Sequence, residues 1–419
     1  MEINKPEKWS INAVLIYLIF VSQLFNEHWG SKVLIVAAIL AIVTSVKSKK
    51  VFKNIFWGYS LYFAFCLLSL VWTIDVSKSV VLIGGMLPFL VIPFWINSID
   101  EPLNFSKIFK WITISYLLVG IYTLVMSWWR YLSSGESAEF FYHTLVLPLE
   151  ANAIYISLWY LMVVLFNIHL QIKKRVDSFF VICNVLLAIY ILLLSSKMIF
   201  TLMIVSVSIL VFPTLKNRVR NLKVFRIGLL TAIVIVISGV ILSGSLYSRF
   251  KKVSNIGEVN EVLTKKEFGQ VYPWNGLTLR VLQLRSFWDI ENSESFNPIL
   301  GVGINNGQLP LNERYKEYNL YAGKKGEANG GFFHYNFHNQ YAQTLIETGI
   351  IGLVILLFII FQWFVWAKNE KSNLILTVSL VFVFLMITES LLLRQKGIVA
   401  FVFIPFLIMK VSKNNLKLG

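Results

Sequence analysis

Long apolar runs separated by short basic clusters dominate this chain of 419 residues and limit what it can fold into. Runs that approach the length needed to cross a bilayer lie at about 11–25, 31–46, 54–72, 79–97, 111–129, 150–168, 178–195, 198–213, 227–246, 350–367, 373–389 and 397–411. Hydrophobic residues make up 57% of the chain and charged residues only 14%, which is too apolar for a soluble domain of this length. The sequence therefore predicts an all-α polytopic membrane protein with about 12 transmembrane helices.

The basic residues predict the orientation of these spans. They give the chain a formal net charge of +16, which by itself would suggest nucleic-acid binding. Most of them, however, cluster in alternate connections, as the basic residues of cytoplasmic loops do. The clusters at 47–53, 107–110, 173–175, 216–226 and 368–371 therefore predict cytoplasmic loops, with both termini in the cytoplasm and no nucleic-acid partner. The first run is interpreted as a retained span, because no small-residue cleavage site follows it.

One connection is much longer than the others and divides the chain. Residues 247–349 are mostly polar, and loops of this length are usually functional or disordered. Their many aromatic residues favour an ordered structure. The predicted organisation is therefore a first group of spans over 1–246, a partly helical loop domain outside the cytoplasm over 247–349, and the last spans with a cytoplasmic tail over 350–419. The glycine-rich segment 323–331 is predicted to be a mobile flap within the loop.

Residues 276–292 of the loop have the pattern of an amphipathic helix. Its apolar stripe recurs at helical spacing and consists of Leu277, Val281, Leu284 and Trp288. Arg280 and Arg285 lie on the two edges of this stripe. We expect the helix to lie on the bilayer surface or under the loop, with its arginines turned toward the occupant of a cavity.

Residues 337–352 combine a polar opening, a short helix, a glycine break and the start of a span: Phe-His-Asn-Gln-Tyr-Ala-Gln-Thr-Leu-Ile-Glu-Thr-Gly-Ile-Ile-Gly. Tyr341, Leu345 and Ile346 have helical spacing, and Gly349 is a helix terminator. His338 is thereby predicted to lie near a membrane surface. An imidazole exchanges protons near neutral pH and can serve as the general base for a hydroxyl nucleophile. The alternative is an interfacial histidine that only caps the helix.

The string His-Asn-Gln-Tyr-x-Gln-x-Leu-x-Glu-x-Gly-x-x-Gly resembles the signature of the O-antigen ligase and O-antigen polymerase superfamily. Two more segments resemble the same family, Asn297-Pro-Ile-Leu-Gly-Val-Gly303 and Glu389-Ser-Leu-Leu-Leu-Arg-Gln-Lys-Gly397. Members transfer glycans from a polyprenyl diphosphate carrier at the outer face of the bacterial inner membrane. The resemblance therefore implies a multi-pass protein of the bacterial inner membrane whose large loop is periplasmic.

Three residues are expected to carry the chemistry of such a transfer. His338 would activate the acceptor hydroxyl, while Arg280 and Lys197 would stabilise the departing diphosphate, which needs fixed cations. In the resembling family an arginine about 60 residues before the His-Asn motif is thought to hold the diphosphate, and Arg280 fits that position best. The family commonly has Ser-Arg where this chain has Ser196-Lys197, a change that keeps the charge and loses the bidentate fork.

Further substrate contacts are expected from Arg285, Arg394, Asn339 and Glu347. Arg285 is the near alternative to Arg280, although it could simply balance an acidic neighbour in its helix. Glu347 is available to orient the histidine or the acceptor. Arg394 is assigned a secondary phosphate or sugar contact, because its separation of five residues from Glu389 is poor for a helical salt bridge.

A metal site is not predicted. His334 and His338 are four residues apart and could chelate an ion, but no His-Glu-x-x-His pattern is present and the residues between them resemble a loop. The two cysteines, Cys66 and Cys183, both lie inside apolar runs, which argues against a disulfide framework or a thiolate zinc site. The predicted cofactor set is empty.

The interpretation that combines these features is an O-antigen ligase-like glycosyltransferase that moves a glycan from undecaprenyl diphosphate to a hydroxyl of lipid A-core or a similar acceptor. Direct displacement predicts inversion at the anomeric carbon without a metal, and no carboxylate pair of the glycosidase type is evident. A polymerase of O-antigen or exopolysaccharide repeat units from the same superfamily is the alternative within this class. A lipid-linked oligosaccharide transporter is the alternative from another class, although the repeated halves of many transporters are not evident. Membrane lipids complete the expected partners.

Overall fold

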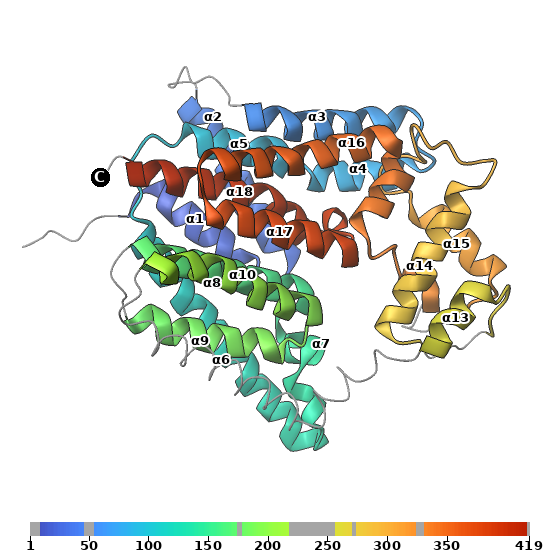
Figure 1. Cartoon of the computed structure of the whole chain (residues 1–419), viewed down its shortest axis with the longest axis horizontal. Helices are drawn as coiled ribbons and strands as arrows, with labels where there is room; N and C mark the ends of the chain where they lie inside the picture. Colours follow the sequence, from blue (N-terminus) through green and yellow to red (C-terminus); the bar gives the residue numbers. More distant parts are fainter. Residues whose placement is uncertain are drawn as a thin grey trace, which may run out of the picture.

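The computed structural model describes residues 9–45, 54–173, 178–217, 256–269, 274–323 and 331–416. Over these residues the chain contains helices and no strand, which confirms the predicted all-α class. Figure 1 shows two parts: a bundle of helices along the long axis of the molecule and a smaller group of helices at one end of that bundle.

The bundle contains α1 (Ile11–Ser22), α2 (Glu27–Ser45), α3 (Asn54–Leu68), α4 (Val76–Gly85), α5 (Pro88–Ser98), α6 (Phe105–Ser134), α8 (Ala153–Lys173), α9 (Ser178–Leu193), α10 (Lys197–Asn217), α16 (Gln340–Asn369), α17 (Asn373–Thr388) and α18 (Gln395–Leu416). Its connections hold α7 (Tyr142–Leu145) and the short 3-10 turns η1 (Ser69–Val71), η2 (Ser137–Phe140), η3 (Leu147–Leu149) and η6 (Leu391–Leu393). The smaller group contains α13 (Ile256–Thr264), α14 (Gly276–Glu291), α15 (Gln308–Glu317) and η5 (Gly331–His334).

Each predicted apolar run within the described residues coincides with helical structure. Five stretches are long and apolar enough to cross a membrane: Val76–Ser98, Phe105–Ser134, Ala153–Ile172, Gln340–Asn369 and Gln395–Ser412. The run predicted at 79–97 is divided into α4 and α5, because Pro88 opens a new helix there. The run predicted at 227–246 lies outside the described residues, so the total of 12 spans remains a prediction.

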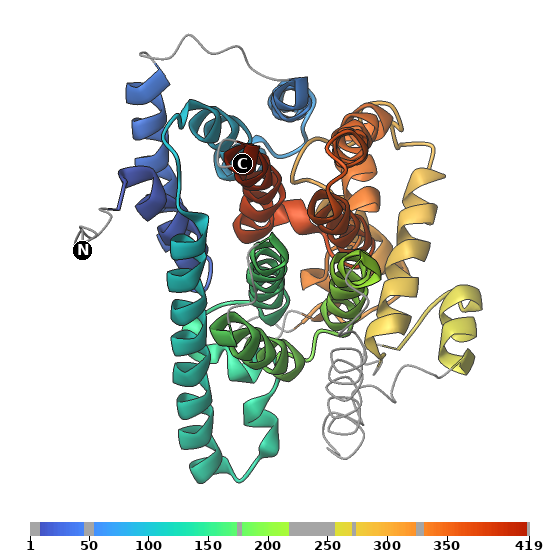
Figure 2. The ribbon, with the colours of Figure 1, turned by 60° about the vertical axis from the view of Figure 1, so that its left-hand side comes forward.

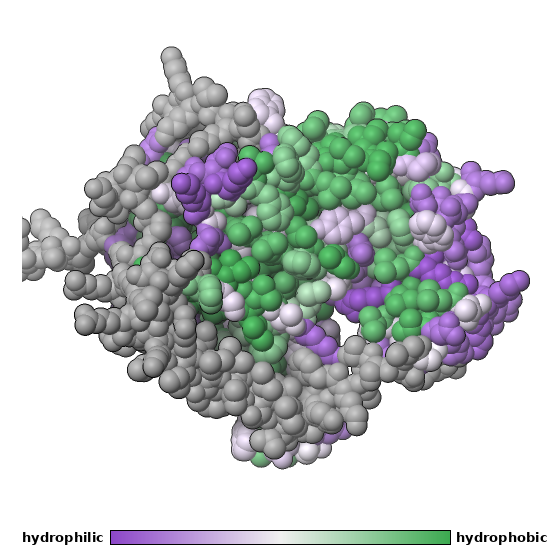
Figure 3. All heavy atoms as spheres, in the orientation of Figure 1, coloured by the Kyte–Doolittle hydropathy of each residue, from purple (hydrophilic) through white to green (hydrophobic). Residues whose placement is uncertain are grey.

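The surface of the bundle is apolar where it faces outward. Large apolar side chains are exposed along α6 and α16, among them Trp111, Leu118, Ile121, Val354 and Phe361. Figure 3 shows apolar residues across the described face of the bundle and polar residues concentrated on the smaller helical group. Soluble proteins rarely expose apolar patches of this extent, whereas a bilayer covers them. The chain is a membrane protein.

The core of the bundle is built around α18. Its residues from Ile398 to Leu407 include a run of side chains that are completely buried. In Figure 2 this helix lies in the middle of the bundle, and it contacts α2, α5, α8 and α17. Aromatic packing contributes here, since the rings of Phe401 and Trp363 have centroids 4.8 Å apart. Neighbouring helices therefore hold α18 in place on several sides.

The smaller helical group has a core of its own that continues into the start of α16. This core consists of Val262, Phe268, Leu282, Ile290, Leu311, Tyr315, Tyr318, Leu320, Phe337, Ala342 and Ile346. The predicted flap at 323–331 falls almost entirely outside the described residues. At its base the amide of Phe332 donates to the carbonyl of Tyr321 at 2.9 Å, so the two sides of that segment meet.

The helix predicted at 276–292 is observed as α14, which begins after an Asn275 cap that accepts hydrogen bonds from the amides of Leu277 and Thr278. The predicted apolar stripe, however, does not build the core of the loop. Leu277, Leu284 and Trp288 are exposed. The buried face instead consists of Thr278, Leu282, Gln283, Ser286 and Ile290. Contacts with α13, α15 and α16 determine which face is covered, and the apolar period of the helix alone does not reveal them.

Candidate active site

A break in α16 at Gly349 is formed together with a distant segment of the loop. Gly349 has φ 64° and ψ −170°, which interrupts the helix. In a continuous helix the carbonyls of Ile346 and Glu347 would accept bonds from amides one turn further on. Here they accept instead from the amides of Val302 and Gly303, each at 2.9 Å. The interruption leaves these polar groups paired, as a helix entering a membrane requires.

The same two segments approach so closely that side chains are excluded between them. The amide of Ile350 donates to the carbonyl of Pro298 at 2.8 Å. A Cβ added at Gly349 would collide with the backbone of Ile299, and one added at Gly301 would lie 2.5 Å from a carbonyl oxygen of α16. The Asn297–Gly303 segment and the Gly349 break, separate in the sequence, thus form one backbone clamp.

Asn306 ties this clamp to the bundle. Its side chain is completely buried, and its Nδ2 donates to the Thr73 hydroxyl at 2.7 Å and to the Ser79 hydroxyl at 2.9 Å. The amide of Asp75 donates to its Oδ1 at 2.9 Å. Every polar atom of the Asn306 side chain therefore has a partner from the turn that precedes α4, which fixes the loop against the bundle.

The backbone at His338 adopts an uncommon conformation just before α16 begins. His338 has φ 44°, in the left-handed region that few residues other than glycine adopt. Its amide donates to Asn336 Oδ1 at 2.8 Å. Asn339 then caps α16, because its Oδ1 accepts from the amides of Tyr341 and Ala342, both at 3.0 Å. Asn339, predicted as a substrate contact, uses its oxygen to begin the helix.

His338, Glu389 and Arg280 form a continuous polar array. His338 Nδ1 lies 3.3 Å from Glu389 Oε2, and Arg280 Nη2 lies 3.0 Å from Glu389 Oε1. The Glu389 side chain is only 9% exposed, compared with 23% for His338 and 31% for Arg280. One carboxylate therefore bridges both groups. When Nδ1 carries the proton that Glu389 accepts, Nε2 presents a lone pair that can take a proton from a hydroxyl.

Arg280 is anchored to the end of α17 as well as to Glu389. Its Nε and Nη2 donate to the carbonyl of Thr388 at 3.3 and 3.1 Å, and its Nη1 donates to the carbonyl of Gly276 at 2.9 Å. All three nitrogens of the guanidinium thus have acceptors within the protein. The arginine fixes the backbone just before Glu389 and holds the carboxylate that contacts the imidazole.

Glu389 is the residue of this array that the sequence interpretation missed. The motif 389–397 contains it, but a pairing with Arg394 was set aside because of the poor separation, and no other partner was predicted. Glu389 instead pairs with Arg280 and His338. The role predicted for Glu347, orienting His338 or the acceptor, remains a prediction. Glu347 is buried and accepts from Gln343 Nε2 at 2.7 Å.

Arg285 lies apart from this array and holds the loop together. Its Nη1 donates to the carbonyls of Val262 and Lys265 at 2.6 and 2.7 Å. Its guanidinium lies 4.7 Å from the centroid of the Tyr318 ring, and its Nε is 3.8 Å from Asp289. These contacts favour the interpretation in which Arg285 balances an acidic neighbour of its own helix.

The two remaining predicted cations begin or precede helices of the bundle. Lys197 is the first residue of α10, which packs against α8 and α17. Arg394 follows η6 and is exposed, and its side chain forms no ion pair with another residue that the structure describes. The hydroxyl of Tyr155 lies within electrostatic range of both Arg394 and Glu389. Arg394 therefore belongs to the same end of the bundle as the array.

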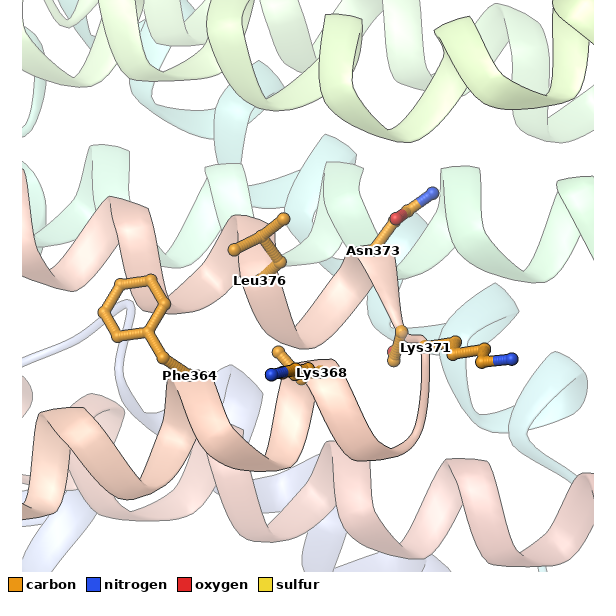
Figure 4. Close-up of a pocket in the computed structure, with 7 residues that line it drawn as sticks. Phe364, Lys368, Lys371, Asn373 and Leu376 are labelled. Atoms are coloured by element: carbon orange, nitrogen blue, oxygen red, sulfur yellow. The ribbon is translucent and has the colours of Figure 1, made fainter.

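A cavity of about 280 Å³ lies elsewhere, at the turn between α16 and α17 (Figure 4). Its lining consists of Phe364, Ala367, Lys368, Lys371, Ser372, Asn373 and Leu376. These residues are at the opposite end of α16 from His338. Within the described ranges, no group of three histidine, cysteine, aspartate or glutamate side chains has an arrangement that would hold a metal ion.

A comparison with protein families matches the part of the chain that contains Arg280, His338 and the backbone clamp. Residues 182–357 match a protein family described as O-antigen ligase. The matched region includes α10, the loop helices, the backbone clamp and the His338 turn, and it ends before Glu389. A search of curated proteins gave no match.

Proposed function

Because residues 182–357 place the chain in the O-antigen ligase superfamily, we propose that it is a membrane glycosyltransferase that moves a glycan from undecaprenyl diphosphate to a hydroxyl acceptor. The observation that carries this proposal is the array of His338, Glu389 and Arg280, in which a buried carboxylate orients a partly exposed imidazole. Such an arrangement is suited to removing a proton from a hydroxyl as it attacks.

In the proposed reaction the acceptor hydroxyl attacks the anomeric carbon of the lipid-linked glycan. A new carbon–oxygen bond forms while the bond to the diphosphate breaks, and the electron pair leaves with undecaprenyl diphosphate. His338 Nε2 takes the hydroxyl proton. A single displacement inverts the anomeric carbon and requires no metal ion, since the base and the cations are side chains of the protein.

The cations of the site have different parts in this proposal. The nitrogens of Arg280 already donate to Thr388, Gly276 and Glu389, so this residue acts mainly by position and by its fixed charge. Lys197 and Arg394 are assigned to the diphosphate. Arg394 is exposed, and its planar fork can bind phosphate oxygens in pairs. Asn339 supports the site by capping α16, and Glu347 and Arg285 by holding the surrounding structure.

The location of the reaction follows from the same proposal. The loop group 247–349 and the array are assigned to the periplasmic face of the bacterial inner membrane, with both termini in the cytoplasm. The positions of the basic clusters in alternate connections support this orientation. Lipid A-core, or another glycan with a free hydroxyl, would then approach from the periplasmic side while the carrier lipid remains among the helices.

The acceptor is tested by a transfer assay with purified protein in detergent and EDTA. Undecaprenyl diphosphate-linked glycan is supplied with lipid A-core, with a second lipid-linked repeat unit, or with no acceptor. We expect glycan to appear on lipid A-core. A ladder that grows on the carrier would identify a polymerase of the same superfamily, and no transfer beside an active control enzyme would contradict the proposal and favour a transporter.

Replacing Glu389 by glutamine is expected to lower kcat in this assay by about 100-fold while KM for the donor changes little. The amide keeps the shape of the side chain but removes the negative charge that orients Nδ1 and pairs with Arg280. The dependence of kcat on pH should also change, which a merely structural role would not cause. The matched control is Glu317→Gln, an exposed glutamate paired with Arg314 in the loop. An unchanged kcat and pH profile in Glu389→Gln would exclude this positioning role.

A further inference from the structure

Lys396 is a buried basic residue that forms no ion pair with any residue that the structure describes. It is the second residue of α18, its side chain is 4% exposed, and its Nζ has no hydrogen-bond partner in the part of the chain that the structure describes. Removing an ammonium group from water is strongly unfavourable unless an anion or several acceptors compensate. A missing partner at this position therefore points to a bound anion.

One charged group acts on Lys396 from a neighbouring helix. Glu27 at the start of α2 is the charged group whose field reaches Lys396, and no ion pair joins the two within the described ranges. Glu27 also acts on the Tyr155 hydroxyl, as do Glu389 and Arg394. Glu389 caps the end of α17 and Lys396 is the second residue of α18, so the carboxylate that contacts His338 and this lysine lie at the two ends of one short connection.

The neighbouring residues keep Lys396 in this position. Gln395 Oε1 accepts a hydrogen bond from the Ser31 hydroxyl of α2 at 2.9 Å. The amide of Gly397 donates to the carbonyl of Arg394 at 3.0 Å, and a Cβ added at Gly397 would collide with Leu391. The first turn of α18 is therefore fixed on both sides, and the positive end of the helix dipole adds to the potential of Lys396.

We propose that Lys396, together with Arg394 and the first turn of α18, binds a phosphate group of the lipid-linked diphosphate donor. A phosphate suits this site because two cations, Arg394 and Lys396, flank the first residue of α18 at the positive end of the helix dipole. Arg394 is exposed and Lys396 is buried, so we expect the ligand to meet Arg394 first. This inference rests on the proposed function and adds a residue to its donor site.

The test measures binding without any turnover. The full-length protein in detergent is titrated with farnesyl diphosphate, with farnesol, and with phosphatidylglycerol, and its melting temperature and Kd are recorded. We expect farnesyl diphosphate to raise the melting temperature of the wild type, and Lys396→Met to weaken its binding by at least about tenfold. Without ligand, Lys396→Met should melt at or above the wild-type temperature, because methionine fills the space without burying a charge.

Controls separate the effect of this lysine from the loss of any positive charge. Lys368→Met and Lys371→Met change lysines of the cavity at the opposite end of α16 and should leave the Kd for farnesyl diphosphate unchanged (Figure 4). Arg394→Gln alters an exposed position, so it should weaken binding without disturbing the core. This second variant keeps the proposal testable if Lys396→Met fails to fold.

Two results would overturn the proposal. If Lys396→Met melts below the wild type and retains the Kd for farnesyl diphosphate, the lysine is structural. If phosphatidylglycerol alone stabilises the wild type through Lys396, the phosphate comes from a lipid headgroup and the donor is excluded as its source. The binding test contains no acceptor, so its outcome does not depend on glycan transfer. If the protein binds farnesyl diphosphate through Lys396 but transfers no glycan in the separate assay, the phosphate site is supported and the proposed function is contradicted.

Discussion

Replacing His338 by alanine is expected to reduce glycan transfer by about 100- to 10,000-fold, the range that general base catalysis usually contributes. The reason is chemical, since no other described side chain combines a free imidazole nitrogen with contact to Glu389. The folded structure should persist, because Asn339 caps α16 and the histidine side chain contributes only one polar contact to its surroundings. The measurement is the initial rate of transfer beside the amount of protein in the membrane.

The left-handed backbone at position 338 calls for a second variant. Alanine adopts φ 44° less readily than histidine or asparagine, so part of an alanine effect would be strain. His338→Asn tolerates this conformation and has no basic nitrogen, and it should be as inactive as His338→Ala. The matched histidine control is His169→Ala. His169 lies near the C-terminal end of α8, and this variant should retain transfer. Activity in His338→Asn close to that of the wild type would exclude His338 as the base.

Replacing Gly349 by alanine is expected to destabilise the fold more than any other single methyl addition near the site. The backbone at φ 64° and ψ −170° is essentially restricted to glycine, and holding another residue there costs about 1–3 kcal/mol. The added Cβ would also collide with the backbone of Ile299, which cannot move without opening the clamp. We expect little folded protein in the membrane, and any that remains should melt at a clearly lower temperature.

Gly84 provides the matched control for that substitution. It lies in α4, and a Cβ at this position meets nothing within 4 Å. Gly84→Ala should therefore be neutral or stabilising by up to about 1 kcal/mol, since alanine loses less backbone entropy in a helix. A Gly349→Ala protein that melts with the wild type and transfers glycan at the wild-type rate would show that the clamp is dispensable.

Features within a single segment could be predicted from the sequence. The apolar runs located the helices of the bundle, because the bilayer requires a minimum apolar length whatever the neighbours are. The boundaries of α14 and the interruption at Gly349 were also predictable, since a capping asparagine and a glycine act on the backbone beside them. The resemblance of the His338 motif to the O-antigen ligase family was evident from consecutive residues alone.

The partners of the charged residues were decided only by the tertiary structure. Glu389 lies 51 residues from His338 and 109 residues from Arg280 in the sequence, and no local pattern links positions so far apart. The same reason explains Arg285, which donates to loop carbonyls, and the face of α14 that becomes buried. Local rules fix where helices begin and end. The packing of one helix against another determines which charges meet and which, like Lys396, have no hydrogen-bond partner among the residues that the structure describes.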